Sequence, residues 1–192
     1  MTQTLKAVAL SGSTFLPSRS LVLAQSLLDG FGRHLHIDSQ LIHLGDIARV
    51  SGAAQSRREL APEAEAVLQA IESAALLIVV SPVYRGALPG QLKHLLDLVG
   101  QDALVDTPVL LAACGGSDRH ALVIDHQLRP LFSFFQSVTL PIGVYATDAD
   151  FSDYRICSPS LQARIDLAVA RALPFFRAHQ REPQAAQARI AA

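Results

Sequence analysis

The sequence predicts a doubly wound α/β fold, in which helices cover both faces of a parallel sheet. Short apolar runs alternate with segments of helical periodicity along the 192-residue chain, and this alternation is typical of parallel strands joined by right-handed crossovers. The runs are continuously apolar, as in strands that are buried on both faces. No internal repeat or linker interrupts the pattern, so we expect one domain.

The first half of the chain supplies three strands and two helices. After the first strand, Ala24, Leu27, Leu28 and Phe31 fall at positions i, i+3, i+4 and i+7 of a helix. Proline and glutamate at residues 62–63 suit the first turn of the second helix. The expected order is a strand at 6–10, a helix ending at 30–32, a half-exposed edge strand at 37–44, a surface excursion at 46–60, a helix from 62 and a central strand at 76–80.

The second half supplies two more strands and a long, interrupted helix. Pro130 lies within the helix expected at 119–136, and its ring crowds the carbonyl group of His126. That helix must bend or bulge there, and π-helical turns are frequent at functional sites. The other expected elements are a helix with an apolar face at 92–99, strands at 108–114 and 138–145, and a last helix with an inward face between 161 and 172. We expect the domain to end at residue 177 and the alanine- and glutamine-rich residues 178–192 to form a disordered tail.

Composition excludes several classes of protein. Half of the residues are apolar, 17% are charged and the formal net charge is −1. A charge so close to neutral lacks the electrostatic footprint of a protein that binds nucleic acid or anionic membranes. The chain shows neither a signal peptide nor an apolar run long enough to span a bilayer. We therefore expect a cytoplasmic protein that binds neither nucleic acid nor membrane.

The cysteines and histidines do not predict a metal site. Cys114 and Cys157 lie far apart without a CxxC motif, and the seven histidines show no metal-ligand spacing. Cys114 ends the fourth strand and is either a reactive thiol or a small buried hydrophobic residue. The serines lack a GxSxG motif, so we do not expect a hydrolytic nucleophile.

The loop at residues 11–20 predicts an anion-binding site. It follows the first strand, precedes a helix and carries five hydroxyl groups, which together with free N–H groups and a helix dipole suit a phosphate monoester. The alternative is that Ser18 or Ser20 only caps the helix. Neither GxxxxGK[ST] nor a dinucleotide fingerprint is present, which favours a single phosphate over a pyrophosphate.

Two further loops follow strands and are expected at the same sheet edge. In the loop after the third strand, Pro82 fixes a turn, Tyr84 offers a flat apolar surface and Gly86 allows close approach of a ligand. Residues 115–117 follow the fourth strand and are suited to the other side of a flat ligand. The alternative is that these prolines and glycines only shape surface turns. Because ligands gather at the carboxyl edge of such sheets, we expect one shared site.

Together these loops resemble the NAD(P)H-dependent FMN reductase family. The resemblance covers residues 6–177, and within the family it is greatest for the FMN reductases of two-component methanesulfonate and alkanesulfonate monooxygenase systems. It implies a flavodoxin-like sheet of five parallel strands in the order 2-1-3-4-5. The motifs that carry it are Gly12-Ser13, Ser18-Arg19-Ser20, Ser81 to Gly86, Pro89 to Lys93, Gly115 to Ser117 and Arg119 to Leu122.

The resemblance also implies roles for individual residues. Ser11, Ser13, Thr14, Ser18 and Ser20 would hold the FMN phosphate; Pro82, Val83, Tyr84, Arg85 and Gly86 would line the isoalloxazine; Gly115, Gly116 and Ser117 would complete the site. Many relatives carry a basic residue directly after the Gly-Ser pair, where this chain has Thr14. Arg19 partly replaces that charge, and weaker flavin retention suits an enzyme that releases reduced FMN.

Hydride transfer needs geometry more than acid–base chemistry, so we assign no catalytic acid or base. Arg85 is the candidate for positioning the nicotinamide. His126 corresponds to a π-bulge residue that, in the resembling branch, lies at a subunit interface near the flavin. The alternative for His126 is an ordinary, partly buried histidine beside a tolerated kink.

The sequence thus predicts an NAD(P)H:FMN oxidoreductase that supplies free reduced FMN to a flavin-dependent sulfonate monooxygenase. The cofactors are FMN and either NADH or NADPH, since no pocket for a 2′-phosphate is recognisable. The resemblance implies a homo-oligomer, either a dimer or a tetramer. The alternatives are an FMN-containing quinone, azo-dye or metal-ion reductase and a non-enzymatic electron carrier like flavodoxin, although such carriers are usually strongly acidic.

Overall fold

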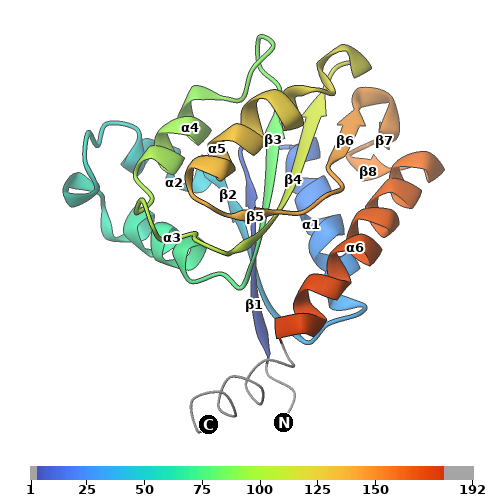
Figure 1. The fold of residues 1–192 in the computed structure, drawn as a ribbon. Coiled ribbons are helices and arrows are strands. Elements are labelled where there is room, and N and C mark those ends of the chain that lie inside the picture. Colours follow the sequence, from blue (N-terminus) through green and yellow to red (C-terminus); the bar gives the residue numbers. More distant parts are fainter. Residues whose placement is uncertain (1–3, 180–192) are drawn as a thin grey trace, which may run out of the picture.

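A parallel sheet in the strand order β2-β1-β3-β4-β5 runs through the middle of the molecule (Figure 1). The computed structural model describes residues 4–179. The strands on this path are β1 (Leu5–Ser11), β2 (Ile37–His43), β3 (Leu76–Pro82), β4 (Pro108–Gly115) and β5 (Val138–Thr139), and β6 (Val144–Thr147) is a further parallel partner of β4. The predicted doubly wound fold and its strand order are confirmed.

Helices cover both faces of the sheet (Figure 1). The sheet thus separates the apolar core into two layers. One layer packs the sheet against α2 (Leu44–Ser51), α3 (Pro62–Glu72), α4 (Gly90–Asp97) and α5 (Arg129–Phe134). The other packs it against α1 (Arg19–Gly32) and α6 (Pro159–His179). Residues of β3 alternate between the layers, which explains why that strand is apolar without interruption from Leu76 to Val80.

The fifth predicted strand is two short strands. Expected over 138–145, it is interrupted between β5 and β6, and both parts pair with β4. Pro141 lies in the interruption and cannot donate a ladder hydrogen bond, and Gly143 follows it. β5 pairs with the start of β4, at Pro108 and Val109, whereas β6 pairs with its end and reaches Gly115.

Residues 46–60, expected to be a surface excursion, contain a helix and a helical turn. α2 begins directly after β2, buries Leu44 and Ile47 against the core, and is followed by the 3-10 turn η1 (Arg57–Glu59). The prediction was wrong for α2 because the helix is only eight residues long. A helix so short shows little periodicity, and its stability comes from tertiary packing.

The long helix expected at 119–136 is divided into three parts. A 3-10 turn, η2 (Asp118–His120), comes first; a π-helix, η3 (Ile124–Leu128), follows, and α5 completes the segment. Pro130 lies in the first turn of α5, where its missing N–H is tolerated. The expected bulge at His126 is confirmed, because this residue is the middle residue of the π-helix.

The remaining elements form the end of the domain. η4 (Asp148–Asp150) follows β6, and a small antiparallel hairpin, β7 (Phe151–Ser152) and β8 (Arg155–Ile156), leads to α6. α6 runs two residues past the expected domain end at 177, and the rest of the expected tail, residues 180–192, lies outside the described residues. Within residues 4–179 no helix has the length and apolar character needed to cross a bilayer.

Candidate functional site

The loops that follow β1, β3 and β4, together with the segment after β6, lie at the carboxyl edge of the sheet (Figure 1). Their residues line one pocket. β1 and β3 lie side by side where the strand order reverses, which is where doubly wound sheets bind ligands. The lining residues in chain order are Ser13, Phe15, Pro17, Ser18, Arg19 and Ser20; Pro82, Val83 and Tyr84; Cys114, Gly115 and Gly116; Asp148 and Tyr154.

The loop after β1 brings buried hydroxyl groups to the N-terminus of α1. Ser18 caps the helix, since its Oγ accepts a hydrogen bond from the N–H of Leu21 at 3.2 Å. The Oγ of Ser13 donates to the carbonyl of Phe15 at 3.1 Å, which tightens the loop. Ser20 lies in the first helical turn and contacts the Cys114 thiol. Helix-terminal N–H groups and hydroxyls surrounding one space form a favourable site for an anion.

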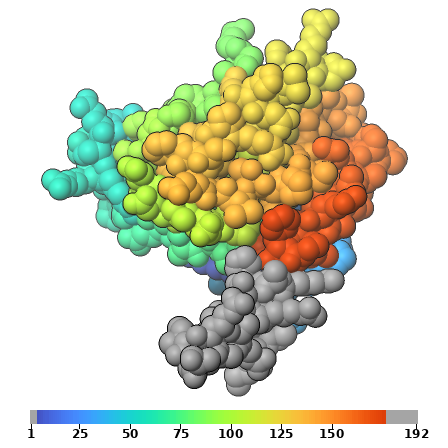
Figure 2. Space-filling model, in the orientation of Figure 1, coloured from blue at the N-terminus to red at the C-terminus, as the bar shows by residue number. Residues whose placement is uncertain are grey.

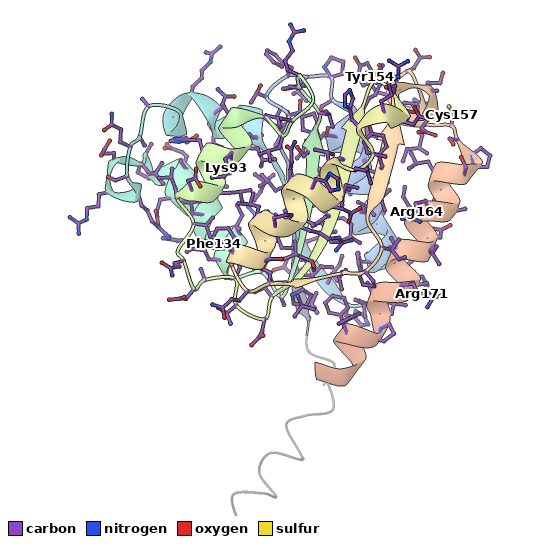
Figure 3. All side chains as sticks on the ribbon, turned by 45° about the horizontal axis from the view of Figure 1, so that its top comes forward. Lys93, Phe134, Tyr154, Cys157, Arg164 and Arg171 are labelled. Carbon is purple, nitrogen blue, oxygen red and sulfur yellow. The ribbon has the colours of Figure 1, made fainter. Side chains whose placement is uncertain are left out.

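Arg19 is the cation of this pocket, and two residues of the segment after β6 hold it. Its Nη1 lies 3.2 Å from Oδ1 of Asp148. Its Cζ lies 5.6 Å from the centre of the Tyr154 ring, within the range of a cation–π contact. Figure 3 shows Tyr154 at the upper edge of the molecule, on the turn between β7 and β8.

Asp148 and Tyr154 form a fourth wall that sequence reasoning missed. The sequence does contain a signal for the turn that carries Asp148. Thr147 and Asp150 have the spacing of a capping box, which marks the start of a helical turn, and both hydrogen bonds of the box form. The hairpin at Tyr154 gave no comparable signal, because its turn is Asp153-Tyr154 rather than Asn-Gly. Both turn residues adopt positive φ angles, 46° and 56°.

The loop after β3 is a tight hairpin that projects from the sheet edge. Tyr84 and Ala87 exchange two backbone hydrogen bonds, at 2.9 and 3.1 Å. The two residues between them, Arg85 and Gly86, have φ angles of 55° and 81°, as in a type I′ turn. Figure 2 shows this hairpin as a green projection, separate from the yellow projection of residues after β4.

Contacts with neighbouring elements hold the hairpin in place. Gln127 of the π-helix accepts from the N–H of Leu88 at 2.9 Å and donates to the carbonyl of Gly86 at 3.3 Å. The N–H of Val83 donates to the carbonyl of Cys114 at 2.8 Å. The hydroxyls of Tyr84 and Ser13 are 3.5 Å apart, so the first two loops meet across the pocket.

The loop after β4 depends on a close approach between backbone and side chain. Tyr145 of β6 donates its hydroxyl hydrogen bond to the carbonyl of Ser117 at 2.6 Å, and partial burial raises the pKa of this hydroxyl above its ordinary value. A Cβ atom on Gly115 would lie 2.1 Å from that hydroxyl oxygen. At Gly116 no atom lies within 4 Å of such a Cβ, so this glycine faces open space in the pocket.

Five of the fourteen predicted binding residues do not line the pocket. Ser11 is fully buried at the end of β1, and its Oγ has no hydrogen-bond partner. Arg85 lines an adjacent hollow with Phe15, Val83 and Tyr84. The other three are Thr14, Gly86 and Ser117, which lie in the loops without lining the pocket. His126 is exposed on the surface of the π-helix.

Cys114 lines the pocket with a neutral thiol. Burial raises the pKa of this thiol to about 12, above its ordinary value of 9.0. It therefore behaves as a small hydrophobic residue and not as a nucleophile. Among residues 4–179, no group of three or more histidine, cysteine, aspartate or glutamate side chains has the arrangement of a metal site.

Comparisons with known proteins agree on one family. The family model described as NADPH-dependent FMN reductase matches residues 5–152. The chain is 68% identical over 179 residues to an NADH-dependent FMN reductase, SfnF, of Pseudomonas fluorescens, with 93% of this chain and 96% of the relative covered. It is 61% identical over 176 residues to an FMN reductase (NADPH) of Pseudomonas aeruginosa, with 92% and 95% covered. An oxidoreductase structure from Corynebacterium diphtheriae superimposes with a TM-score of 0.81 at 26% identity, covering 91% of this chain and 97% of that one.

Proposed function

Because the chain belongs to the NADPH-dependent FMN reductase family, we propose that it passes the reduced FMN it makes to a flavin-dependent sulfonate monooxygenase. The chain is an NAD(P)H:FMN oxidoreductase, and its cofactors are FMN and a nicotinamide nucleotide. The two bacterial relatives are named for different nucleotides, NADH in one and NADPH in the other.

One observation carries the assignment of the site: three loops and the N-terminus of α1 converge on a single pocket. The hydroxyls of Ser13, Ser18 and Ser20, the first-turn N–H groups of α1 and the guanidinium of Arg19 suit the FMN phosphate. The open space at Gly116, where a side chain would intrude, suits a ring lying against backbone. These residues fit FMN, which supplies the redox chemistry when it is bound.

The chain's own contribution is to position the reactants. We assign the flat face of Tyr84 and the backbone of Pro82 and Val83 to the isoalloxazine side of the pocket. Arg85, at the hairpin tip beside the pocket, is the proposed contact for the nicotinamide nucleotide. Ser11, buried at the end of β1, and Thr14, in the loop after it, are assigned to the support of the phosphate loop, and Gly86 and Ser117 to the shape of the two flanking loops. No side chain is assigned as acid or base.

The oligomer is a separate proposal. We infer a homodimer or homotetramer, supported by large apolar side chains that are exposed on the surface: Phe15 in the loop after β1, Leu122 before the π-helix and Phe134 at the end of α5. In this assembly the exposed His126 would face a neighbouring subunit. Size-exclusion chromatography with light scattering tests the proposal, and a monomer at micromolar concentration contradicts it.

We also propose a cytoplasmic location and residues 1–177 as the functional domain.

The test of the enzyme is a flavin titration followed by turnover. Purified protein should bind FMN and then oxidise NADH or NADPH, measured by the loss of nicotinamide absorbance. No oxidation with either nucleotide contradicts the assignment. Coupling to a purified sulfonate monooxygenase should release sulfite only when the reductase is present. Tight retention of FMN with ping-pong kinetics toward quinones or azo dyes would instead favour a reductase with its own terminal acceptor.

A further inference from the structure

The segment after β6 holds the one cation that lines the flavin pocket. Asp148 and Tyr154 contact Arg19 from this segment, and all three line the pocket together with Ser18 and Ser20. A carboxylate beside a proposed phosphate site is unexpected, because like charges repel even where, as here, the side chains of Arg19 and Asp148 are 40% and 55% exposed. Its presence requires a physical explanation.

The local backbone does not need the Asp148 carboxylate. Asp150 closes the capping box of η4, since its Oδ2 accepts from the N–H of Thr147 at 2.7 Å and from the hydroxyl of Thr147 at 2.9 Å. The charged partner of Asp148 is Arg19. Tyr154 lies over the same guanidinium from a left-handed conformation with a φ of 56°. Such conformations are unfavourable for a bulky residue and concentrate at functional sites.

We propose that Asp148 is a specificity-determining residue that weakens the binding of flavins with a 5′-phosphate. This inference rests on the proposed function and refines it. The carboxylate occupies one edge of the Arg19 guanidinium and opposes the charge of the phosphate, so the phosphate contributes less to affinity than the donor set alone would allow. A reductase that hands its flavin to a partner needs such exchange, because tightly held FMN would not be released.

The test compares FMN with riboflavin, which lacks the phosphate. Asp148→Asn keeps the side-chain shape and removes the charge. We expect it to lower the Kd for FMN by about three- to tenfold and to leave the Kd for riboflavin within about twofold of the wild-type value. Flavin fluorescence quenching measures both. Asp153→Asn is the matched control, because it removes the same charge from the same segment outside the pocket lining.

A second variant separates competition for Arg19 from a general charge effect. In an Arg19→Gln background the Asp148→Asn change should tighten FMN binding less than it does in the wild type. An equal gain in both backgrounds, an unchanged or weaker FMN affinity in Asp148→Asn, or the same gain for riboflavin overturns the proposal. Each of these results leaves the reductase assignment intact, provided that wild-type protein still oxidises NAD(P)H with FMN. Loss of that wild-type activity contradicts the proposed function instead.

Discussion

Gly115 and Gly116 are neighbours in the same loop, yet the structure gives them different tasks. A Cβ on Gly115 would collide with the Tyr145 hydroxyl, which holds the loop by its hydrogen bond to Ser117. A Cβ on Gly116 meets no protein atom and enters the space proposed for the flavin. Stability and binding therefore depend on different members of the pair.

We expect Gly115→Ala to destabilise the fold by about 1–3 kcal/mol, because the tyrosine must move and its hydrogen bond is lost. Gly116→Ala should leave the melting temperature unchanged and weaken FMN binding by about tenfold. Thermal melts and flavin titrations measure the two effects. Adding Tyr145→Phe to Gly115→Ala should recover part of the stability by removing the colliding oxygen. Equal melting temperatures for the two single variants would contradict this division.

The two cysteines should differ sharply in reactivity. The pKa of about 12 at Cys114 gives it a thiolate fraction about a thousandfold smaller than an ordinary thiol with a pKa of 9.0. Cys157 is exposed. At pH 8, iodoacetamide should modify Cys157 within minutes and leave Cys114 unmodified, as measured by peptide mass spectrometry. Unfolding the protein should make both cysteines reactive, and rapid labelling of native Cys114 would show that the pocket opens.

At the scale of secondary-structure elements, the side chain of Gln127 links the π-helix to the hairpin after β3. Gln127 bonds to the backbone of both Leu88 and Gly86. The π-helix ends two residues before Pro130, and it places Gln127 where it reaches the hairpin. We therefore propose that Gln127 affects the side of the pocket assigned to the isoalloxazine ring, whereas Asp148 affects the side assigned to the phosphate.

We expect Gln127→Ala to raise the Kd for FMN and for riboflavin by a similar factor, about three- to tenfold, because the loosened hairpin is the one proposed to contact the ring and not the phosphate. Gln127→Glu is the matched control. It keeps the acceptor for the Leu88 N–H and loses only the longer bond to Gly86, so it should lose less affinity. Flavin titrations measure both variants. An effect confined to FMN would contradict the assignment of this hairpin to the ring.

The elements that could be predicted are those whose signal is long or chemically distinctive. β3 is continuously apolar from Leu76 to Val80, and Pro130 requires the helix around it to bend or bulge. The fourth wall could not be predicted, because β7 and β8 contain two residues each and their turn lacks glycine. α2 was missed for a related reason, since its burial depends on partners that are distant in sequence.

On the scale of the whole molecule, the sequence predicts where the site lies better than it predicts which side chains line the pocket. Strand order brings the three predicted loops to one edge, so the position of the site follows from the sequence. Which side chains enter the pocket depends on local turns, and this explains why Ser11 is buried beneath it while Asp148 lines it. Ion pairs between distant elements belong to the same class of unpredicted contact.

An ion-pair network far from the pocket proposed for FMN should make the stability of the fold depend on pH. Arg57 bonds Glu65 and Glu72 of α3, and Glu72 also accepts the N–H of Gly100 at 2.8 Å. The hydrogen bond from Arg57 lowers the pKa of Glu65 below its ordinary value of 4.5. A carboxylate with a lowered pKa stabilises the folded state above the unfolded-state pKa, and this contribution disappears as the pH falls through the folded-state pKa.

We therefore expect Arg57→Gln to lower the melting temperature at pH 7 by about 2–4 °C. The difference from wild type should begin to shrink near pH 4.5 and disappear as the pH falls through the lowered pKa of Glu65 in the folded wild type, below which this carboxyl group is protonated in both proteins. Arg58→Gln is the matched control, because Arg58 is exposed and no ion pair to it is present among the contacts of the described residues. Calorimetry of the three proteins across this pH range measures the effect. A difference that stays constant with pH would mean that Arg57 stabilises the fold by packing alone, since only the charged interaction is lost when the carboxylate takes up a proton.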